Sequence, residues 1–168
     1  MTQNNQLITA AAWAAARGAL KGVPKGPGLC LAFARVVVEA GLGMRERELY
    51  ARYLVAGTTH RPGDERVRLA AARMSPWATD FEASVKKLAW GVPLADRQPG
   101  DLIFNHNAAK PFGHVGILLD ANTVLENIDH DYRPRSILLP NSLALTPLES
   151  RAWTLVARVQ PEKGVIHV

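Results

Sequence analysis

The sequence predicts an α+β fold in which N-terminal helices pack against a C-terminal antiparallel β-sheet. Three observations support this prediction. Apolar residues recur at helical spacing before residue 93, short apolar segments separated by turns follow it, and the two kinds of segment do not alternate. The length of 168 residues is close to that of one ordinary domain, so we expect residues 1–168 to form a single domain.

The first two predicted helices lead to the only cysteine. The alanine-rich residues 6–20 predict a helix, and the glycines and prolines that follow predict a loop. From Cys30 onward, apolar residues recur at i, i+3, i+4, i+7 and i+8, which predicts a helix that ends at Gly41 and Gly43. Cys30 is therefore expected in the first turn of a helix.

Three further helices are expected before the sheet begins. Residues 45–56 and 64–74 have helical patterns. Thr79 and Glu82, three residues apart, form a capping-box signature, which predicts a helix that continues to about Trp90.

The second half of the chain contains the predicted strands. Residues 102–104 follow a Pro-Gly-Asp turn, and residues 114–119 and 124–128 flank a short polar segment. This pattern predicts a β-hairpin. Residues 152–159 predict the last strand, which completes the expected antiparallel layer.

Charge and composition narrow the classes of partner. The chain has 20 Lys and Arg against 15 Asp and Glu, a net charge of +5 that suits a polyanionic partner. Residues 45–73 are the densest basic stretch, but they also contain acids at helical spacing, which indicates a solvated helix face. No nucleic-acid-binding motif is present, so no nucleic acid is expected. No apolar run is long enough to predict membrane insertion.

The N-terminal apolar stretch does not resemble a signal peptide. Residues 1–7 contain no Lys or Arg, and Trp13 and Arg17 interrupt the apolar run that follows. We therefore expect the chain to be synthesised in the cytoplasm without a signal peptide.

The single cysteine allows two interpretations. One cysteine cannot form an internal disulfide or a multi-cysteine zinc site, so Cys30 is either a small apolar residue or a reactive thiol. A thiolate in the first turn of a helix is stabilised by unpaired backbone N–H groups and by the positive end of the helix dipole. This placement favours a nucleophile.

A nucleophilic thiol needs a base, and His114 is the candidate. Gly113 and Gly116 flank it in an otherwise apolar strand, which leaves room for another backbone or a substrate to approach. The chain has four other histidines, His60, His106, His130 and His167, of which His60 and His106 lie in polar loops and His167 at the terminus.

Glu126 and Asn127 are the candidates for the residue that orients the imidazole. A hairpin loop of two or four residues pairs position 119 with 124 and places Asn127 diagonal to His114. A three-residue loop exchanges the roles of the two candidates. Because even-numbered loops are the more common connection, we rank Asn127 first and Glu126 second.

Four segments occur in a characteristic order along residues 13–128. They are Gly-Pro-Gly-Leu-Cys30, Pro99-Gly100-Asp101-Leu-Ile-Phe, Gly113-His114-Val115-Gly116-Ile117 and Val124-Leu125-Glu126-Asn127. Together they resemble the NlpC-type and CHAP-type papain-like cysteine peptidases of bacterial cell walls.

This resemblance implies a papain-like fold that cleaves amide bonds in peptidoglycan, as an endopeptidase or amidase, with no metal and no cofactor. Cys30 would be the nucleophile, His114 the general base and acid, and Asn127 or Glu126 the orienting residue. The expected partner is peptidoglycan, and we expect a monomer. The implied place of action is the cell wall, where a phage lysin, a tail-associated enzyme or a secretion-system effector would act.

Three alternatives are open. The chain could be an inactive cell-wall-binding module of the same fold, or a basic nucleic-acid-binding protein built on residues 45–73. A zinc hydrolase could use Asp101, His106 and His114 as ligands. We expect Trp77, Trp90 and Trp153 to be core and sheet anchors, and Arg133 and Arg135 are candidate substrate contacts.

Overall fold

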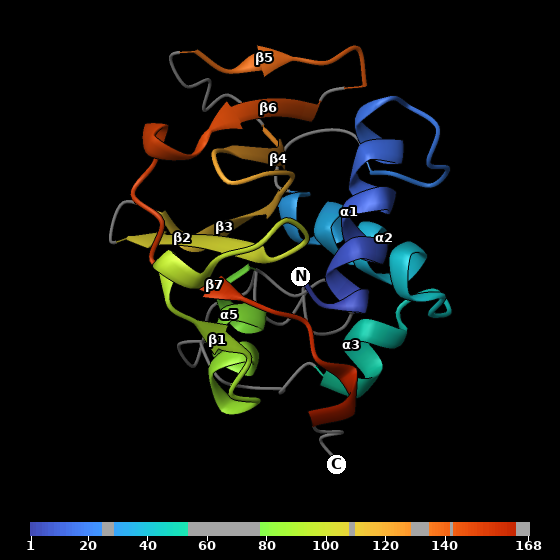
Figure 1. The fold of residues 1–168 in the computed structure, drawn as a ribbon, viewed down its shortest axis with the longest axis vertical. Coiled ribbons are helices and arrows are strands. Elements are labelled where there is room, and N and C mark those ends of the chain that lie inside the picture. Colours follow the sequence, from blue (N-terminus) through green and yellow to red (C-terminus); the bar gives the residue numbers. More distant parts are fainter. Residues whose placement is uncertain (25–28, 54–77, 108–109, 129–134, 142, 164–168) are drawn as a thin grey trace, which may run out of the picture.

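The structure is a computed structural model that describes residues 1–24, 29–53, 78–107, 110–128, 135–141 and 143–163. Helices occupy the N-terminal half and an antiparallel sheet the C-terminal half, which confirms the predicted α+β class (Figure 1). The helix expected over residues 64–74 and the end of the one expected over residues 45–56 lie outside the described residues.

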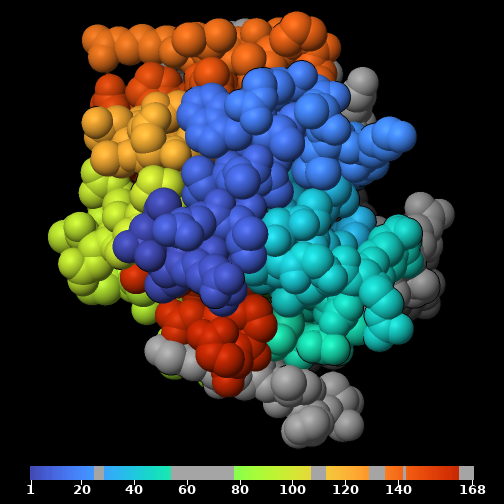
Figure 2. All heavy atoms as spheres, turned by 45° about the vertical axis from the view of Figure 1, so that its right-hand side comes forward, coloured from blue at the N-terminus to red at the C-terminus, as the bar shows by residue number. Residues whose placement is uncertain are grey.

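The α-helices of the described part precede all of its strands. They are α1 (Gln3–Ala16), α2 (Cys30–Leu42), α3 (Glu48–Tyr53) and α5 (Ala78–Lys87). In Figure 2, α1 and α2 lie side by side in blue and cyan on the outside of the molecule.

Helix α2 begins at Cys30, as predicted, and Gly43 closes it in the left-handed conformation with φ 65°. The helix runs through Gly41 instead of ending there. A Cβ at Gly41 would lie 2.9 Å from the Cα of Ile8 in α1. The glycine therefore lets the two helix backbones approach closely, and this packing fixes the direction in which α2 presents its first turn.

Helix α5 includes Thr79, so the expected capping box, in which Thr79 precedes the helix, is wrong. The buried Thr79 hydroxyl has no hydrogen-bond partner among the described residues, because Thr79 lies inside the first turn and not before it. Glu82 instead binds Lys86, with Oε1 2.7 Å from Nζ, and lies 3.7 Å from His106.

Seven strands form one sheet in the order β1-β7-β2-β3-β4-β6-β5, and every neighbouring pair is antiparallel. The predicted strands correspond to β2, β3, β4 and β7, whereas β1, β5 and β6 were not predicted. The strands are β1 (Gly91–Val92), β2 (Leu102–Asn107), β3 (Lys110–Leu118), β4 (Thr123–Asn127), β5 (Ile137–Leu138), β6 (Leu143–Pro147) and β7 (Leu155–Ala157).

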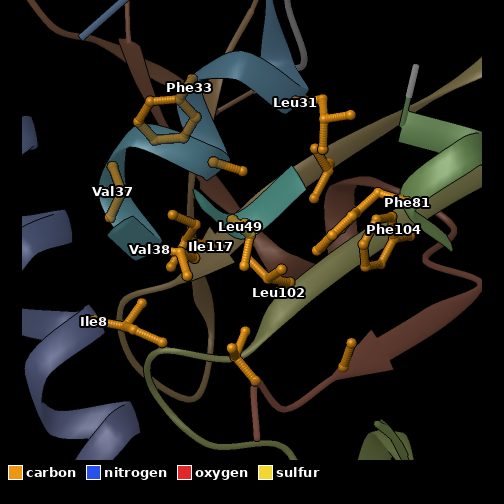
Figure 3. Packing of buried hydrophobic residues seen from close by; sticks show 14 of the residues in the cluster. Ile8, Leu31, Phe33, Val37, Val38, Leu49, Phe81, Leu102, Phe104 and Ile117 are labelled. Carbon is orange, nitrogen blue, oxygen red and sulfur yellow. The ribbon is translucent and has the colours of Figure 1, made fainter. Parts of the chain in front are cut away.

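The main core lies between the helices and one face of this sheet. Figure 3 shows apolar side chains from α1, α2, α3 and α5 packed against Leu102, Phe104 and Ile117 of the sheet. A smaller cluster on the opposite face contains Ile103 and Leu118. Within the described part of the chain, no helix is both long and apolar enough to span a membrane.

The hairpin between β3 and β4 differs from the expected register. Leu118 pairs with Val124 and Gly116 with Glu126, and the N–H of Leu119 donates to the carbonyl of Thr123 at 2.9 Å. The loop therefore has three residues, 120–122, and the expected pairing of position 119 with 124 is wrong. Asp120 Oδ1 accepts a hydrogen bond of 2.8 Å from the N–H of Asn122, which favours this tight turn.

Candidate active site

Cys30 is the first residue of α2, and its side chain is half-buried. The preceding residue, Leu29, offers no side-chain cap to the helix. The backbone N–H of Leu31, in the first turn, instead hydrogen-bonds to the Cys30 thiol. First-turn N–H groups have no partner within a helix, so they are available to stabilise a thiolate.

His114 lies in β3 and is held from two sides. Its neighbour Gly113 has φ 67°, and a Cβ there would lie 3.0 Å from Cγ2 of Thr79 and 3.3 Å from its backbone nitrogen. The glycine thus admits the first turn of α5 beside the histidine, which confirms the predicted close approach of another backbone. In the sheet, His114 pairs with Asn105 of β2.

The His114 side chain reaches Glu126, with Nε2 2.6 Å from Oε2. The register explains this contact, because Glu126 pairs directly with Gly116 and is therefore diagonal to His114. A Cβ at Gly116 would overlap the side chain of Val124. The imidazole also hydrogen-bonds to the side chain of Cys30, so it lies between the thiol and the carboxylate.

The charges of Cys30 and His114 stabilise each other. Burial would raise the pKa of the Cys30 thiol, but the hydrogen bond and charge of His114, with the N–H groups of Val115 and Leu31, lower it overall. Burial would lower the pKa of His114, but Cys30 and Glu126 raise it overall. The site therefore favours a thiolate beside an imidazolium.

Glu126 is held as a carboxylate deep in the sheet. Its side chain is fully buried, and Arg151 places Nε 3.1 Å from Oε2 and Nη2 3.4 Å from Oε1. Burial would raise the pKa of Glu126, but hydrogen bonding and charge from His114 and Arg151, with a hydrogen bond from Thr146, lower it overall. Glu126 is thus an ionised acceptor for the imidazole.

Asn127 lies on the other side of β4 and does not contact His114. Its Nδ2 donates a 3.0 Å hydrogen bond to the carbonyl of Pro24, in the segment between α1 and α2. Among the described residues its buried Oδ1 has no partner. The ranking of Asn127 above Glu126 is therefore wrong in geometry, because a three-residue loop exchanges the faces of β4 on which the two side chains lie.

The zinc alternative is not supported by the positions of its proposed ligands. Asp101 binds Arg158, with Oδ2 2.9 Å from Nη2, and His106 lies beside Glu82. In the part of the chain that the structure describes, no three His, Cys, Asp or Glu side chains gather as a metal site. The Asp101 carboxylate therefore forms a structural ion pair with Arg158 and is not placed to bind a metal.

The remaining predicted residues are dispersed. Trp90 is fully buried, as expected of a core anchor, and Trp153 is half-buried beside His114, with ring centroids 6.3 Å apart. Arg135 is exposed and lies 3.7 Å from Glu149. The predictions for four residues fall outside the described part, namely His60, His167, Trp77 and Arg133.

Sequence reasoning missed Arg151, Thr146 and Asn105. Each is a single polar residue in or near a strand, and nothing in the local sequence separates such a residue from a solvated one. Their positions depend on strand pairing, which brings Arg151 to Glu126 across 25 residues of chain.

The geometry can perform nucleophilic catalysis. A thiolate at a helix start, an imidazole beside it and a carboxylate behind the imidazole match the requirements for a thiol nucleophile, a general acid and base, and an orienting group. Comparisons of the chain with protein-family models, curated proteins and solved structures found no match.

Proposed function

We propose that this chain is a cysteine-dependent hydrolase with a papain-like fold that cleaves amide bonds in bacterial peptidoglycan. The observation that carries the proposal is the continuous series from Cys30 through His114 to Glu126. A cysteine that only fills space needs neither a lowered pKa nor a base oriented by a buried carboxylate. Both features together support a nucleophile.

The proposed reaction proceeds through a thioester. The Cys30 thiolate attacks the amide carbonyl carbon, and the backbone N–H of Cys30 donates to the oxygen that becomes negative. His114 gives a proton to the amine as the C–N bond breaks. Water then attacks the thioester and passes a proton to His114. The carboxylic acid product leaves, and the thiolate and imidazolium are restored.

Peptidoglycan is the substrate that two sequence features favour. The ordered segments around Cys30, His114 and Glu126 resemble those of cell-wall peptidases, and the net charge of +5 would attract an anionic wall polymer. The scissile bond is an amide within the stem peptide or between sugar and peptide. The enzyme would act at the cell wall, as a phage lysin, a tail-associated enzyme or a secretion-system effector.

The test is digestion of purified sacculi by the wild type and by Cys30→Ala and Cys30→Ser, with mass spectrometry of the released fragments. We expect new amine and carboxyl ends from the wild type and background release from both variants, whose circular dichroism should match that of the wild type. Equal cleavage by all three proteins would overturn the proposal. Binding of sacculi without turnover would identify an inactive module, and salt-sensitive duplex binding that survives Cys30→Ala would identify a nucleic-acid-binding protein.

A second measurement follows the thiol itself. Because Cys30 is the only cysteine, iodoacetamide labels one position. We expect alkylation of the folded wild type well below the ordinary thiol pKa of 9.0, because His114 lowers the pKa of Cys30. Alkylation only after unfolding would identify Cys30 as a buried structural residue and contradict its role as nucleophile.

A further inference from the structure

We propose that Arg151 is a positioning residue for the Cys30–His114 pair, and that its buried guanidinium keeps Glu126 ionised and directed at the imidazole. This inference rests on the proposed function for its chemistry. It adds a cation behind the carboxylate, so that four side chains act in series from Arg151 to Cys30.

The burial of the Arg151–Glu126 pair is the first argument. The two side chains are 1% and 0% exposed, and Nε of Arg151 lies within 3.4 Å of both carboxylate oxygens. Removing two charges from water is costly, and an apolar pair of similar volume is often as stable or more stable. A buried pair that also contacts His114 is therefore better explained by the need for a charged carboxylate at that place.

The surroundings of Arg151 are the second argument. The side chain of Asn105 donates to the carbonyl of Ala152, and Nε1 of Trp153 donates to the carbonyl of Leu148 at 2.9 Å. The Arg151 guanidinium lies over the Trp153 ring, 5.9 Å from its centroid. Residues on both sides of Arg151 are thus fixed, so its guanidinium meets Glu126 in a set orientation.

The polar groups that face Glu126 come from each neighbouring element. They are His114 on β3, Thr146 on β6 with Ser136 3.0 Å behind it, and Arg151 after β6. The Cys30 thiol faces the far side of His114. The exposed charges of this region, Arg135 and Glu149, lie 3.7 Å apart and pair with each other. Beside the titratable His114, Arg151 is accordingly the permanently charged cation nearest the carboxylate in the described structure.

The functional consequence concerns acidic pH. Without Arg151, burial would dominate and Glu126 would become protonated at a higher pH. A neutral Glu126 no longer stabilises the imidazolium, and the Cys30 thiolate loses its partner. Arg151 therefore sets the lower pH limit at which the thiolate survives.

The experiment measures the rate of Cys30 alkylation by iodoacetamide against pH in the wild type, Arg151→Ala and Arg151→Lys. We define the acid limit as the pH below which the rate of Cys30 alkylation falls. We expect the acid limit of Arg151→Ala to lie about 1–3 pH units above that of the wild type, since an adjacent opposite charge shifts a carboxyl pKa by this amount. Arg151→Lys keeps the charge, so its limit should stay close to that of the wild type. With sacculi at neutral pH, Arg151→Ala should lower kcat more than it changes KM.

Chemical rescue separates charge from shape. Arg151 and Trp153 line a surface cavity of about 420 Å³, so a small cation can enter the space that Arg151→Ala vacates. We expect millimolar guanidinium to restore the acid limit and equal urea to leave it unchanged. Restoration by urea as well would contradict a role for the charge.

The outcomes distinguish the two proposals. A wild type whose Cys30 alkylation follows an unlowered thiol pKa of 9.0 overturns the proposed function. If the wild type is reactive and Arg151→Ala has the same acid limit, the proposed role of Arg151 is overturned, whereas the proposed function is not. If circular dichroism shows that Arg151→Ala does not fold, Arg151→Gln replaces it, because glutamine keeps N–H donors but carries no charge. An unshifted acid limit in Arg151→Gln would also overturn the role of Arg151.

Discussion

Two buried carboxylates, one in the sheet and one directly before a strand, each pair with an arginine in similar geometry. At the start of β2, Asp101 accepts hydrogen bonds from Arg158 at 3.0 and 2.9 Å. In β4, Glu126 accepts its closest bond from Arg151 at 3.1 Å. Both carboxylates are fully shielded from solvent. Pairing with an arginine therefore does not distinguish the two sites.

The difference lies in what else each carboxylate binds. Asp101 also accepts from Asn5 Nδ2 at 2.7 Å and from the N–H of Gln98 at 2.8 Å, and these amides do not titrate. A Cβ at the adjacent Gly100 would overlap the backbone of Asn5, so α1 is docked tightly on this turn. Glu126 instead binds His114, which gains or loses a proton. The first pair joins a helix to the sheet, whereas the second ends at a reactive group.

The largest expected effect is on stability and is shared by the two pairs. Glu126→Gln removes the carboxylate from the buried Arg151, which should cost about 3–5 kcal/mol of unfolding free energy at pH 7, and Asp101→Asn should cost less, because Arg158 is only half-buried. Urea denaturation measures both. Because the pKa of Glu126 is lowered by folding, its stabilisation is present above its ordinary pKa of 4.5 and is lost as pH falls through the folded value. A Glu126→Gln cost that stays constant down to acidic pH would contradict this assignment.

The next effect should separate the pairs. Glu126 raises the pKa of His114, so Glu126→Gln should lower the thiolate fraction of Cys30, as a neutral Glu126 does, and should also move the alkaline limit of Cys30 reactivity, where the imidazolium loses its proton, to lower pH. Asp101→Asn is the matched control and should leave that limit unchanged in the folded fraction. The pH dependence of iodoacetamide alkylation is the measurement. Equal shifts in both variants would break the comparison.

A smaller effect tests the space between His114 and Glu126. A Cβ at Gly116 would overlap Val124, so Gly116→Ala should cost about 1–3 kcal/mol and slow sacculus cleavage by displacing Glu126. Gly91→Ala is a suitable control, because a Cβ there meets Leu155 Cδ1 at an ordinary 3.5 Å. Equal loss of stability in both variants would mean that the cost comes from replacing any strand glycine, and not from the overlap with Val124.

The smallest expected effect concerns Asn127. Asn127→Ala removes the hydrogen bond to Pro24 and should cost about 0.5–1.5 kcal/mol. Since Asn127 does not contact His114, both pH limits of thiol alkylation should match those of the wild type. A shifted alkaline limit would show that Asn127 also affects the His114 imidazole, and would contradict the assignment of Glu126 as its orienting residue.

Local patterns were sufficient to predict the α+β class, the start of α2 at Cys30 and the hairpin that contains His114. Helical periodicity and turn residues depend on neighbours in the chain, so they can be interpreted without knowing the tertiary structure. The choice between Glu126 and Asn127 required the length of one loop. The Asp120 side chain that closes this loop was the local signal for three residues.

Other parts of the structure have no local signal. Strands β1 and β5 contain two residues each, too few for an alternating pattern. The contact of Arg151 with Glu126 depends on the pairing of β4 with β6, which precedes Arg151. Tertiary pairing of this kind determines the buried charges and therefore the part of the site that sequence reasoning missed.

The order of the site residues along the chain has a consequence for folding. Cys30 lies in the helical half, whereas its three partners come from the sheet, and the last of them is Arg151. Closing such long loops is entropically costly, and contacts between distant residues slow folding. A growing polypeptide therefore carries an ordinary thiol until the chain has been synthesised at least as far as Arg151. For a chain proposed to cut amide bonds, this delay keeps unfinished molecules inert.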